Sequence, residues 1–205
     1  MWTLIDTHIH SEFSDCSGLR LEDIVKKAVS AGLDGICITD HNNNSIKDKA
    51  DYISKKCDFL IITGIEFWTE IGDIICFGLN REYHYTGQYL VNSVNDILNG
   101  NEGCLFILPH PFRMNFETKL DKFEQIKDKF SAIEVLNTNA SDEANLKAYE
   151  YALKNGFKIT GGSDAHSLDK VGRYVTAIKS RVRSEDDFIR EIKYGRYYGA
   201  SLFGY

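Results

Sequence analysis

The sequence lacks paired cysteines, long apolar runs and an excess of positive charge. Its five cysteines stand singly, none forms a CxxC pair, and their odd number argues against a disulfide framework. We therefore expect reduced thiols in a cytoplasmic protein. No apolar stretch is long enough to cross a bilayer, and the N-terminus lacks the basic, apolar and small-residue order of a signal peptide. These absences predict a protein that does not contact a membrane.

The charge balance argues against a further class of partner. The formal net charge is -6, whereas proteins that bind extended nucleic acid carry clustered lysines and arginines that neutralise phosphates. A single nucleotide is not excluded, because bound divalent ions can invert the local electrostatic field. We therefore expect a small-molecule substrate and no extended nucleic-acid binding. The sequence gives no indication of the oligomeric state.

Length and patterning point to one α/β domain over residues 1–205. The chain is 43% hydrophobic and 26% charged, which is ordinary for a globular protein, and it contains no repeat, low-complexity tract or linker. Strands alternate with helices, which is typical of an α/β fold with parallel strands. About seven strand–helix units predict a closed or nearly closed (β/α)7 barrel, since a full eight-unit barrel usually needs more residues.

Apolar runs and helical spacing locate the individual elements. The segment 74–77 follows the apolar run 59–65 at a short distance, and we interpret it as the hairpin partner of that run. The predicted strands cover residues 2–5, 35–39, 59–65, 74–77, 104–108, 132–136, 158–160 and 174–178, and the predicted helices cover residues 21–28, 44–56, 89–99, 120–130, 143–155 and 185–194.

Histidines and carboxylates gather where the predicted strands end. His8 and His10 follow the first strand at i and i+2, so both imidazoles point to the same side of an extended chain. Sites in α/β proteins are built at the C-terminal ends of strands. Of the six histidines only His84 lies elsewhere, and we expect it to be a loop residue. The remaining polar residues at strand ends are His41, Glu66, His110, Asp164 and His166.

Imidazoles and carboxylates together suit zinc, manganese or iron. Cys16 and Cys37 are interpreted as packing residues, so no thiolate is expected in the site. More than four ligands predict at least two metal ions, and a carboxylate such as Glu66 can bridge them. Paired metals can convert water into hydroxide near neutral pH and stabilise the attacking and leaving oxygens of an in-line displacement. The pattern therefore predicts phosphoester hydrolysis.

The site residues belong to short motifs that run across nearly the whole chain. In their order and spacing these motifs resemble the polymerase and histidinol phosphatase (PHP) domain family. The resemblance implies a distorted seven-stranded β/α barrel with a trinuclear metal centre and metal-dependent phosphoesterase activity. The motifs are Asp6-Thr7-His8-Ile9-His10, Ser14-Asp15, Thr39-Asp40-His41, Gly64-Ile65-Glu66, Pro109-His110-Pro111 and Gly162-Ser163-Asp164-Ala165-His166.

The resemblance also implies how the ligands are shared among two to three divalent ions. The third ion would take Glu66, His110 and a further histidine from the hairpin after Glu66. The hairpin segment 72–75 has no histidine, so Asp73 is the nearest equivalent, and the third ion is held by Asp73, held weakly or absent. The first ion would take His8, His10, Glu66 and Asp164, and the second Asp15, His41 and His166.

Other polar residues at the strand ends are candidates for supporting or substrate-binding roles. Asp6 and Asp40 lie beside ligands, where they either orient imidazoles or cap loop amides. Arg113 follows the histidine at 110 and is the best candidate to clamp a phosphate, because a guanidinium matches phosphate geometry, although it could instead pair with carboxylates. Arg173 and Asn137 are further candidates for binding substrate at the same rim.

The function expected from these residues is hydrolysis of small phosphomonoesters or nucleotides, with Arg113 and Asp164 acting in the reaction. A short-oligonucleotide exonuclease and an enzyme similar to histidinol phosphatase are alternatives within the same chemistry. Two alternatives come from other classes. A TatD-like or other amidohydrolase-type metal hydrolase also begins with HxH on its first strand, and a non-catalytic metal-binding module would keep the ligands without turnover.

Overall fold

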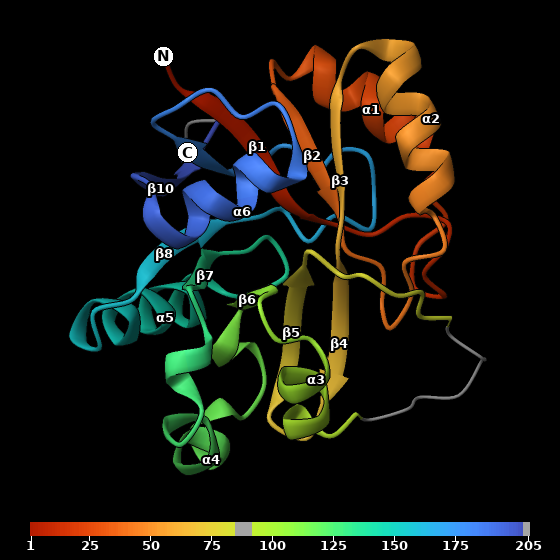
Figure 1. Cartoon of the computed structure of the whole chain (residues 1–205). Coiled ribbons are helices and arrows are strands. Elements are labelled where there is room, and N and C mark those ends of the chain that lie inside the picture. The colour runs from red at the N-terminus through yellow and green to blue at the C-terminus, as the bar shows by residue number, and fades with distance from the viewer. Residues whose placement is uncertain (85–91, 203–205) are drawn as a thin grey trace.

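The computed structural model describes residues 1–84 and 92–202, and these form two mixed five-stranded sheets with helices packed around them (Figure 1). The strand order is β10-β9-β1-β2-β3 in the first sheet and β4-β5-β6-β7-β8 in the second. None of the helices among these residues is long and apolar enough to span a bilayer.

The first sheet contains the N-terminal strand, which carries the HxH pair. β1 and β2 pair in parallel, as do β2 and β3, whereas β9 runs antiparallel to both β1 and β10. The helices α1 and α2 lie beside β1, β2 and β3 in Figure 1. The bounds of these elements are β1 Thr3–Ile9, α1 Leu21–Ser30, β2 Gly35–Ile38, α2 Lys47–Cys57, β3 Leu60–Thr63, β9 Tyr174–Ile178 and β10 Tyr197–Ser201.

The second sheet begins with a hairpin in which β4 and β5 pair antiparallel from Ile65–Cys76 to Thr69–Gly72. The predicted strand 59–65 is divided at Gly64 into β3, which pairs with β2, and the start of β4, so the hairpin partner of β5 is 65–69 and not 59–65. β6 is antiparallel to β5, and β6, β7 and β8 are parallel. The bounds are β4 Ile65–Thr69, β5 Gly72–Phe77, α3 Val94–Gly100, β6 Leu105–Leu108, α4 Leu120–Glu124, β7 Ala132–Leu136, α5 Asp142–Lys154, β8 Lys158–Gly161 and α6 Glu185–Tyr194, with 3-10 turns at Pro111–Arg113, Phe116–Lys119 and Lys127–Lys129.

The two sheets meet along two seams, but neither sheet is closed. At one seam β3 passes into β4 through Gly64, whose amide donates to the carbonyl of Ile38. At the other, Gly161 of β8 exchanges hydrogen bonds with the hydroxyl of Thr176 in β9. The α/β class is confirmed, whereas the closed (β/α)7 barrel is not.

Two predicted helices are shorter in the structure. The helix predicted over 89–99 corresponds to α3, and its first residues, 89–91, lie outside the described residues. The helix predicted over 120–130 ends after Glu124 and continues as a 3-10 turn. The Ser184 hydroxyl accepts from the amide of Asp187 and caps α6.

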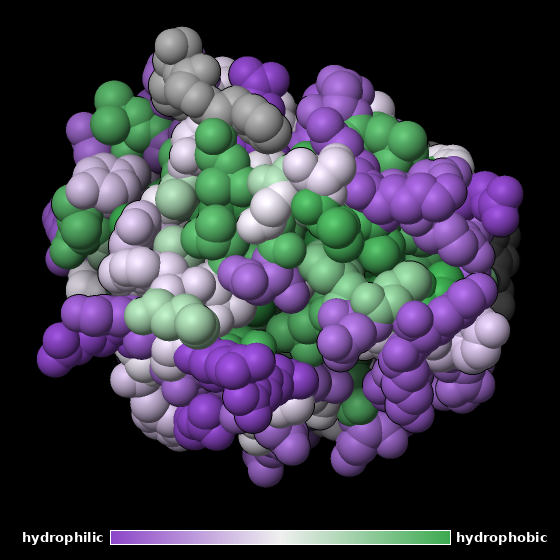
Figure 2. All heavy atoms as spheres, turned by 90° about the horizontal axis from the view of Figure 1, so that it is seen from above, coloured by the Kyte–Doolittle hydropathy of each residue, from purple (hydrophilic) through white to green (hydrophobic). Residues whose placement is uncertain are grey.

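Apolar side chains fill the interior of both sheets and also appear on one outer face. Ile5, Ile36 and Cys37 are fully buried, as expected for strands covered on both sides. A view from above shows apolar side chains gathered inside a hydrophilic border (Figure 2). Among exposed large side chains, the Trp2 and Tyr198 rings meet edge to face with centroids 5.2 Å apart. This contact links the chain before β1 to β10.

Replacing Gly64 by alanine should destabilise the seam between β3 and β4. A Cβ at this position would lie 2.6 Å from the Phe77 ring and 2.8 Å from the Cys76 carbonyl oxygen. Since overpacking a dense core costs about 1–3 kcal/mol, we expect Gly64→Ala to lower the free energy of unfolding by that amount. Urea unfolding measures it. Gly18→Ala is the matched control, because no atom lies within 4 Å of its added Cβ, and an equal effect there would contradict the explanation.

Candidate metal centre

The histidines and carboxylates predicted at strand ends meet where the two sheets face each other. His8, at the end of β1, and Glu66, in β4, come from different sheets and are both buried. The loops after β1, β2, β6 and β8 supply His10, His41, His110 and Asp164 respectively. His84 lies apart from this cluster as an exposed residue whose Nε2 is 3.0 Å from Glu82.

His8 and His10 direct their Nε2 atoms at the same two carboxylates. Oε2 of Glu66 lies 3.4 Å from Nε2 of His8 and 3.1 Å from Nε2 of His10. Oδ1 of Asp164 lies 3.5 Å and 3.1 Å from the same two nitrogens. The two Nε2 atoms are 3.2 Å apart. Four potential ligand atoms therefore surround one point in the buried interior.

This arrangement fits a divalent ion. Ligand atoms about 2.1 Å from an ion lie roughly 3.0–3.4 Å from one another in octahedral or tetrahedral geometry, close to the separations observed here. The Nδ1 atom of His8 lies 3.2 Å from a carboxylate oxygen of Glu134, to which it can only donate. In the neutral imidazole of His8 the lone pair therefore lies on Nε2, the nitrogen that faces the cluster and that a metal ion would bind.

Glu66 occupies the middle of the cluster. Its Oε2 is also 3.1 Å from Nδ1 of His41, and its Oε1 is 3.0 Å from Nε2 of His110. Burial opposes the charge on Glu66, but the surrounding histidines outweigh it and hold the pKa of this carboxyl well below its usual range. The pKa of Asp164 is lowered in the same way, against burial, by His8, His10 and His110. Both carboxylates are thus ready to accept a cation.

A second group of potential ligand atoms forms beside the first. It consists of His10, Cys16, His41 and His166, whose nitrogen and sulfur atoms all lie within 4.8 Å of one another. Asp15, expected here from the family resemblance, is exposed and belongs to no such group among the described residues. Cys16, interpreted from the sequence as a packing residue, faces the histidines instead.

A third group contains Glu66, Asp73 and His110. Arg113 lies against it and donates from Nη1 to Oδ2 of Asp164 at 2.7 Å and from Nη2 to Oδ2 of Asp73 at 3.2 Å. Asp73 thus lies where the missing hairpin histidine was expected, but it shares its carboxylate with a guanidinium. Arg113 both pairs with carboxylates and lies beside the potential ligands.

Several buried polar residues hold the ligands in place. The side-chain amide of Asn137 donates to Glu134 at 2.7 Å and to Asp164 at 3.2 Å. Because Asn137 is fully buried, its placement favours positioning of these carboxylates over contact with a substrate. Glu134 was missed by the sequence analysis, although an acidic residue inside the apolar run 132–136 was a signal for it.

Asp6 and Asp40 cap loop amides. Asp6 accepts from the amides of Ser163 and Gly172, both at 2.8 Å. Asp40 accepts from the amide and the hydroxyl of Ser11 at 2.7 Å and 2.6 Å. Burial raises the pKa of Asp6 to about 6, and these amides counteract it. Of the two roles expected for the aspartates, the hydrogen bonds of the described residues support loop capping.

Two residues of the cluster have left-handed backbone conformations. His110 has φ of 29° and Asp164 has φ of 50°, in a region that non-glycine residues seldom adopt. Such strain persists only where the surroundings fix it and is concentrated at functional sites. The amide of Asp164, held 2.7 Å from the His8 carbonyl oxygen, supplies one such constraint.

A small cavity of about 180 Å³ adjoins the cluster on the side of β4, β5 and the loop after β6. Arg113 and Lys119 supply its cationic groups and Asp73 a carboxylate, while Trp68 and Met114 form apolar walls alongside His110. The Trp68 ring also packs on His41, with centroids 4.5 Å apart. Arg173, by contrast, is exposed, and no described residue forms an ion pair with it.

Comparison with known sequences identifies the family. The PHP domain model matches residues 6–142 and the PHP-associated model matches residues 142–197. The chain belongs to the PHP family. An uncharacterized protein of Methanocaldococcus jannaschii is 32% identical to it over 194 residues, which cover 89% of this chain and 74% of the relative.

Two solved structures of different kinds of protein share this fold. A two-domain protein of Bacteroides vulgatus, containing a predicted PHP-like metal-dependent phosphoesterase, superposes with a TM-score of 0.74 at 21% identity, over 98% of this chain and 65% of that one. A lesion-specific endonuclease of Pyrococcus furiosus superposes with a TM-score of 0.68 at 19% identity, over 97% of this chain and 58% of that one. This PHP chain thus spans less than two thirds of either structure.

Glu134→Gln should weaken metal binding in this PHP protein without unfolding it. The carboxylate fixes the proton of His8 on Nδ1, and loss of such an outer partner typically weakens metal affinity by about 10- to 100-fold. Competition against a chromogenic chelator measures the affinity, and circular dichroism checks the fold. Glu143→Gln, an exposed residue of α5, is the control. Unchanged affinity in Glu134→Gln would show that the His8–Glu134 contact does not support a ligand.

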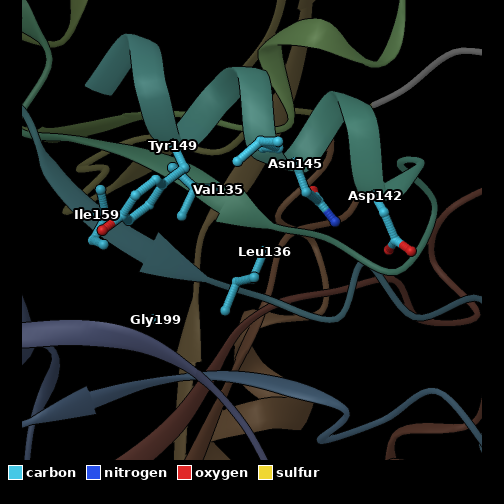
Figure 3. A pocket seen from close by; sticks show the side chains of 8 residues that line it. Val135, Leu136, Asp142, Asn145, Tyr149, Ile159 and Gly199 are labelled. Carbon is cyan, nitrogen blue, oxygen red and sulfur yellow. The ribbon is translucent and has the colours of Figure 1, made fainter. Parts of the chain in front are cut away.

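A larger hollow lies apart from the ligands, between α5 and the strands β7, β8 and β10 (Figure 3). It has a volume of about 320 Å³, and its lining includes Val135, Leu136, Tyr149 and Ile159. Among the described residues that line it, Asp142 is the only carboxylate and none is a histidine. The hollow therefore contains no group of potential metal ligands like those around Glu66.

Proposed function

We propose that the protein is a metal-dependent phosphoesterase that hydrolyses small phosphomonoesters or nucleotides with two to three divalent ions, zinc, manganese or iron. The observation that carries this proposal is the small cavity, lined by Arg113 and Lys119, beside the convergent ligand groups. Arg113 lines the cavity and contacts Asp164, so a phosphate in the cavity would touch both the guanidinium and the ligand cluster. Membership of the PHP family supports the same chemistry.

Asp164 connects the ligands to the phosphate-binding side. One oxygen, Oδ1, faces the Nε2 atoms of His8 and His10, and the other, Oδ2, accepts from Arg113. Divalent ions held by the cluster would lower the pKa of water and neutralise charge on phosphate oxygens. Arg113 would bind the non-bridging oxygens through its paired N–H groups and stabilise the charge that develops on them.

The walls of the cavity support a small substrate. Its volume of about 180 Å³ accommodates a phosphate with a short attached group. Lys119 adds a second cation, and the Trp68 ring offers an apolar face to a base or sugar. The net charge of -6 favours small anions bound at this point over an extended nucleic acid or a membrane surface. We also propose a cytoplasmic location, because the unpaired cysteines suit a reducing compartment.

Phosphate release by the purified protein, loaded in turn with manganese, zinc and iron, tests the proposal. The panel contains phosphomonoesters including histidinol phosphate, nucleotides including 3′,5′-bisphosphates, and short oligonucleotides. Turnover of a monoester or nucleotide that is lost with chelator would support the proposal. Turnover of oligonucleotides alone would establish the exonuclease alternative. Bound metal without phosphate release from any compound would favour another hydrolase chemistry or a binding role.

Arg113→Lys should reduce kcat/KM by about 10- to 100-fold. A lysine keeps the charge but loses the paired donors, and a hydrogen bond to a charged group contributes about 1.5–3 kcal/mol. Steady-state kinetics on the best substrate of the panel measure the effect, with metal content determined in parallel. Arg183→Lys, at an exposed position, is the control. Unchanged kinetics in Arg113→Lys would restrict Arg113 to structural pairing with Asp73 and Asp164.

A further inference from the structure

Cys16 has the most distinctive surroundings of the five cysteines. It lies in the loop between β1 and α1, where its sulfur and the nitrogens of His10, His41 and His166 form one group within 4.8 Å. Cys37 and Cys76 are buried and Cys104 is half-buried, whereas Cys57, at the end of α2, is exposed like Cys16. Among the described residues, Cys16 is the only cysteine in a group of potential metal ligands.

The protonation of His166 shows that its second nitrogen is available to a cation. Nδ1 of His166 lies 2.9 Å from the carbonyl oxygen of Asp164, which only accepts, so Nδ1 carries the proton. Nε2 then presents its lone pair toward Sγ of Cys16, 3.1 Å away. Two electron pairs at this distance require a proton or a cation between them. A carbonyl that fixes the tautomer in this way is typical of histidines that bind metals.

His41 supplies a buried nitrogen without a hydrogen-bond partner. Its side chain is 13% exposed, and its Nδ1 atom is buried without a hydrogen-bond partner, although Oε2 of Glu66 lies 3.1 Å away. A buried nitrogen without a partner is costly. An ion between His41 and the neighbouring ligand atoms would satisfy it.

Asp15 does not belong to this group among the described residues. It is exposed, and no hydrogen bond or ion pair joins its side chain to the described residues. We propose that Cys16, together with His41 and His166, binds one of the metal ions, in the place that the family resemblance gives to Asp15. The inference rests on the proposed metal centre and changes the chemistry of one of its ions.

A sulfur ligand changes the preference of the site among metals. Thiolate and aspartate carry the same charge, so the substitution leaves the electrostatic balance of the cluster intact. Thiolates favour zinc and iron, however, whereas carboxylates suit manganese and magnesium. When the ion binds, it replaces the thiol proton of Cys16, and that proton passes to solvent.

Cobalt absorption tests the ligand directly, without turnover. Metal-free protein is titrated with Co²⁺, and a thiolate ligand gives an intense near-ultraviolet sulfur-to-cobalt charge-transfer band. The band should appear in the unaltered protein, in Asp15→Asn and in the matched thiol control Cys57→Ser, and should be lost in Cys16→Ser. A band that persists in Cys16→Ser, or that is absent from the unaltered protein, would overturn the inference. So would loss of cobalt binding in Asp15→Asn alone.

Alkylation provides an independent readout on the unaltered protein. With zinc at about ten times its Kd, the metal-free fraction falls about tenfold, so iodoacetamide labelling of Cys16 should fall by that factor while labelling of Cys57 stays unchanged. Equal labelling of Cys16 with and without zinc would contradict the inference. Both experiments test this inference independently of the proposed function. A protein that shows the cobalt band but releases no phosphate would support Cys16 as a metal ligand and contradict the proposed phosphoesterase activity.

Discussion

Glu66→Gln is expected to lower kcat/KM by at least about 1000-fold. The carboxylate of Glu66 lies within 3.4 Å of a nitrogen of each of four histidines, namely His8, His10, His41 and His110. Glutamine has the same shape but no charge, and one of its two terminal atoms is an N–H donor that repels a cation. Loss of a shared ligand removes several kcal/mol of transition-state stabilisation, and each 1.36 kcal/mol is tenfold in rate.

Two measurements separate this effect from misfolding. Metal content by atomic emission should fall with the activity, while circular dichroism should retain the α/β spectrum. Glu70→Gln, in the turn of the same hairpin, is the matched control, because Glu70 accepts from the amide of Val94 and joins no ligand group among the described residues. Full activity in Glu66→Gln would refute the proposed metal centre.

Metal binding is expected to raise the melting temperature strongly. An ion at about 1000 times its Kd stabilises the native state by about 4 kcal/mol. For a chain of this size that corresponds to roughly 8–16 °C, since each kcal/mol shifts Tm by about 2–4 °C. The effect arises because the ligands come from both sheets, so an ion at the seam is bound only when the sheets are assembled.

Differential scanning calorimetry of metal-free protein, with and without added zinc, measures this shift. Glu66→Gln should lose most of it, because the residue contributes to more than one group of ligands. Glu70→Gln should keep it. A shift of equal size in all three proteins would mean that zinc stabilises the fold at some other place.

The convergence of most candidate ligands could be predicted because strand ends impose a simple geometry, whereas Asp15 lies outside the ligand groups of the described residues. An HxH pair on extended chain must point to one side, and His8 and His10 do so. A loop that follows a buried strand must emerge at the same edge as its parallel neighbours, which brought His41, His110 and Asp164 together. These relations depend only on local sequence patterns, so a single sequence is enough to predict them.

Other features depend on contacts between distant segments and could not be predicted. Whether Asp15 or Cys16 faces the histidines is decided by the conformation of one loop. Glu134 was hidden within an apolar strand, and Lys119 and Trp68 carry no motif. Tertiary packing decides the antiparallel pairing of β9 with β1 and the junction between β3 and β4 at Gly64. Because these contacts leave no local pattern, the alternation of strands and helices predicted a more regular barrel than the structure has.

The candidate ligands are divided between the two parts of the chain that the family models match. The PHP domain match ends at residue 142, yet Asp164 and His166 lie beyond it, within the PHP-associated match. The second segment also contributes β8 and β9, and β9 pairs with β1. Neither segment alone carries all of the candidate ligands. A break in the chain within 142–164 would therefore separate His8 and His10 from Asp164 and His166, and would leave each part with an incomplete set of candidate ligands.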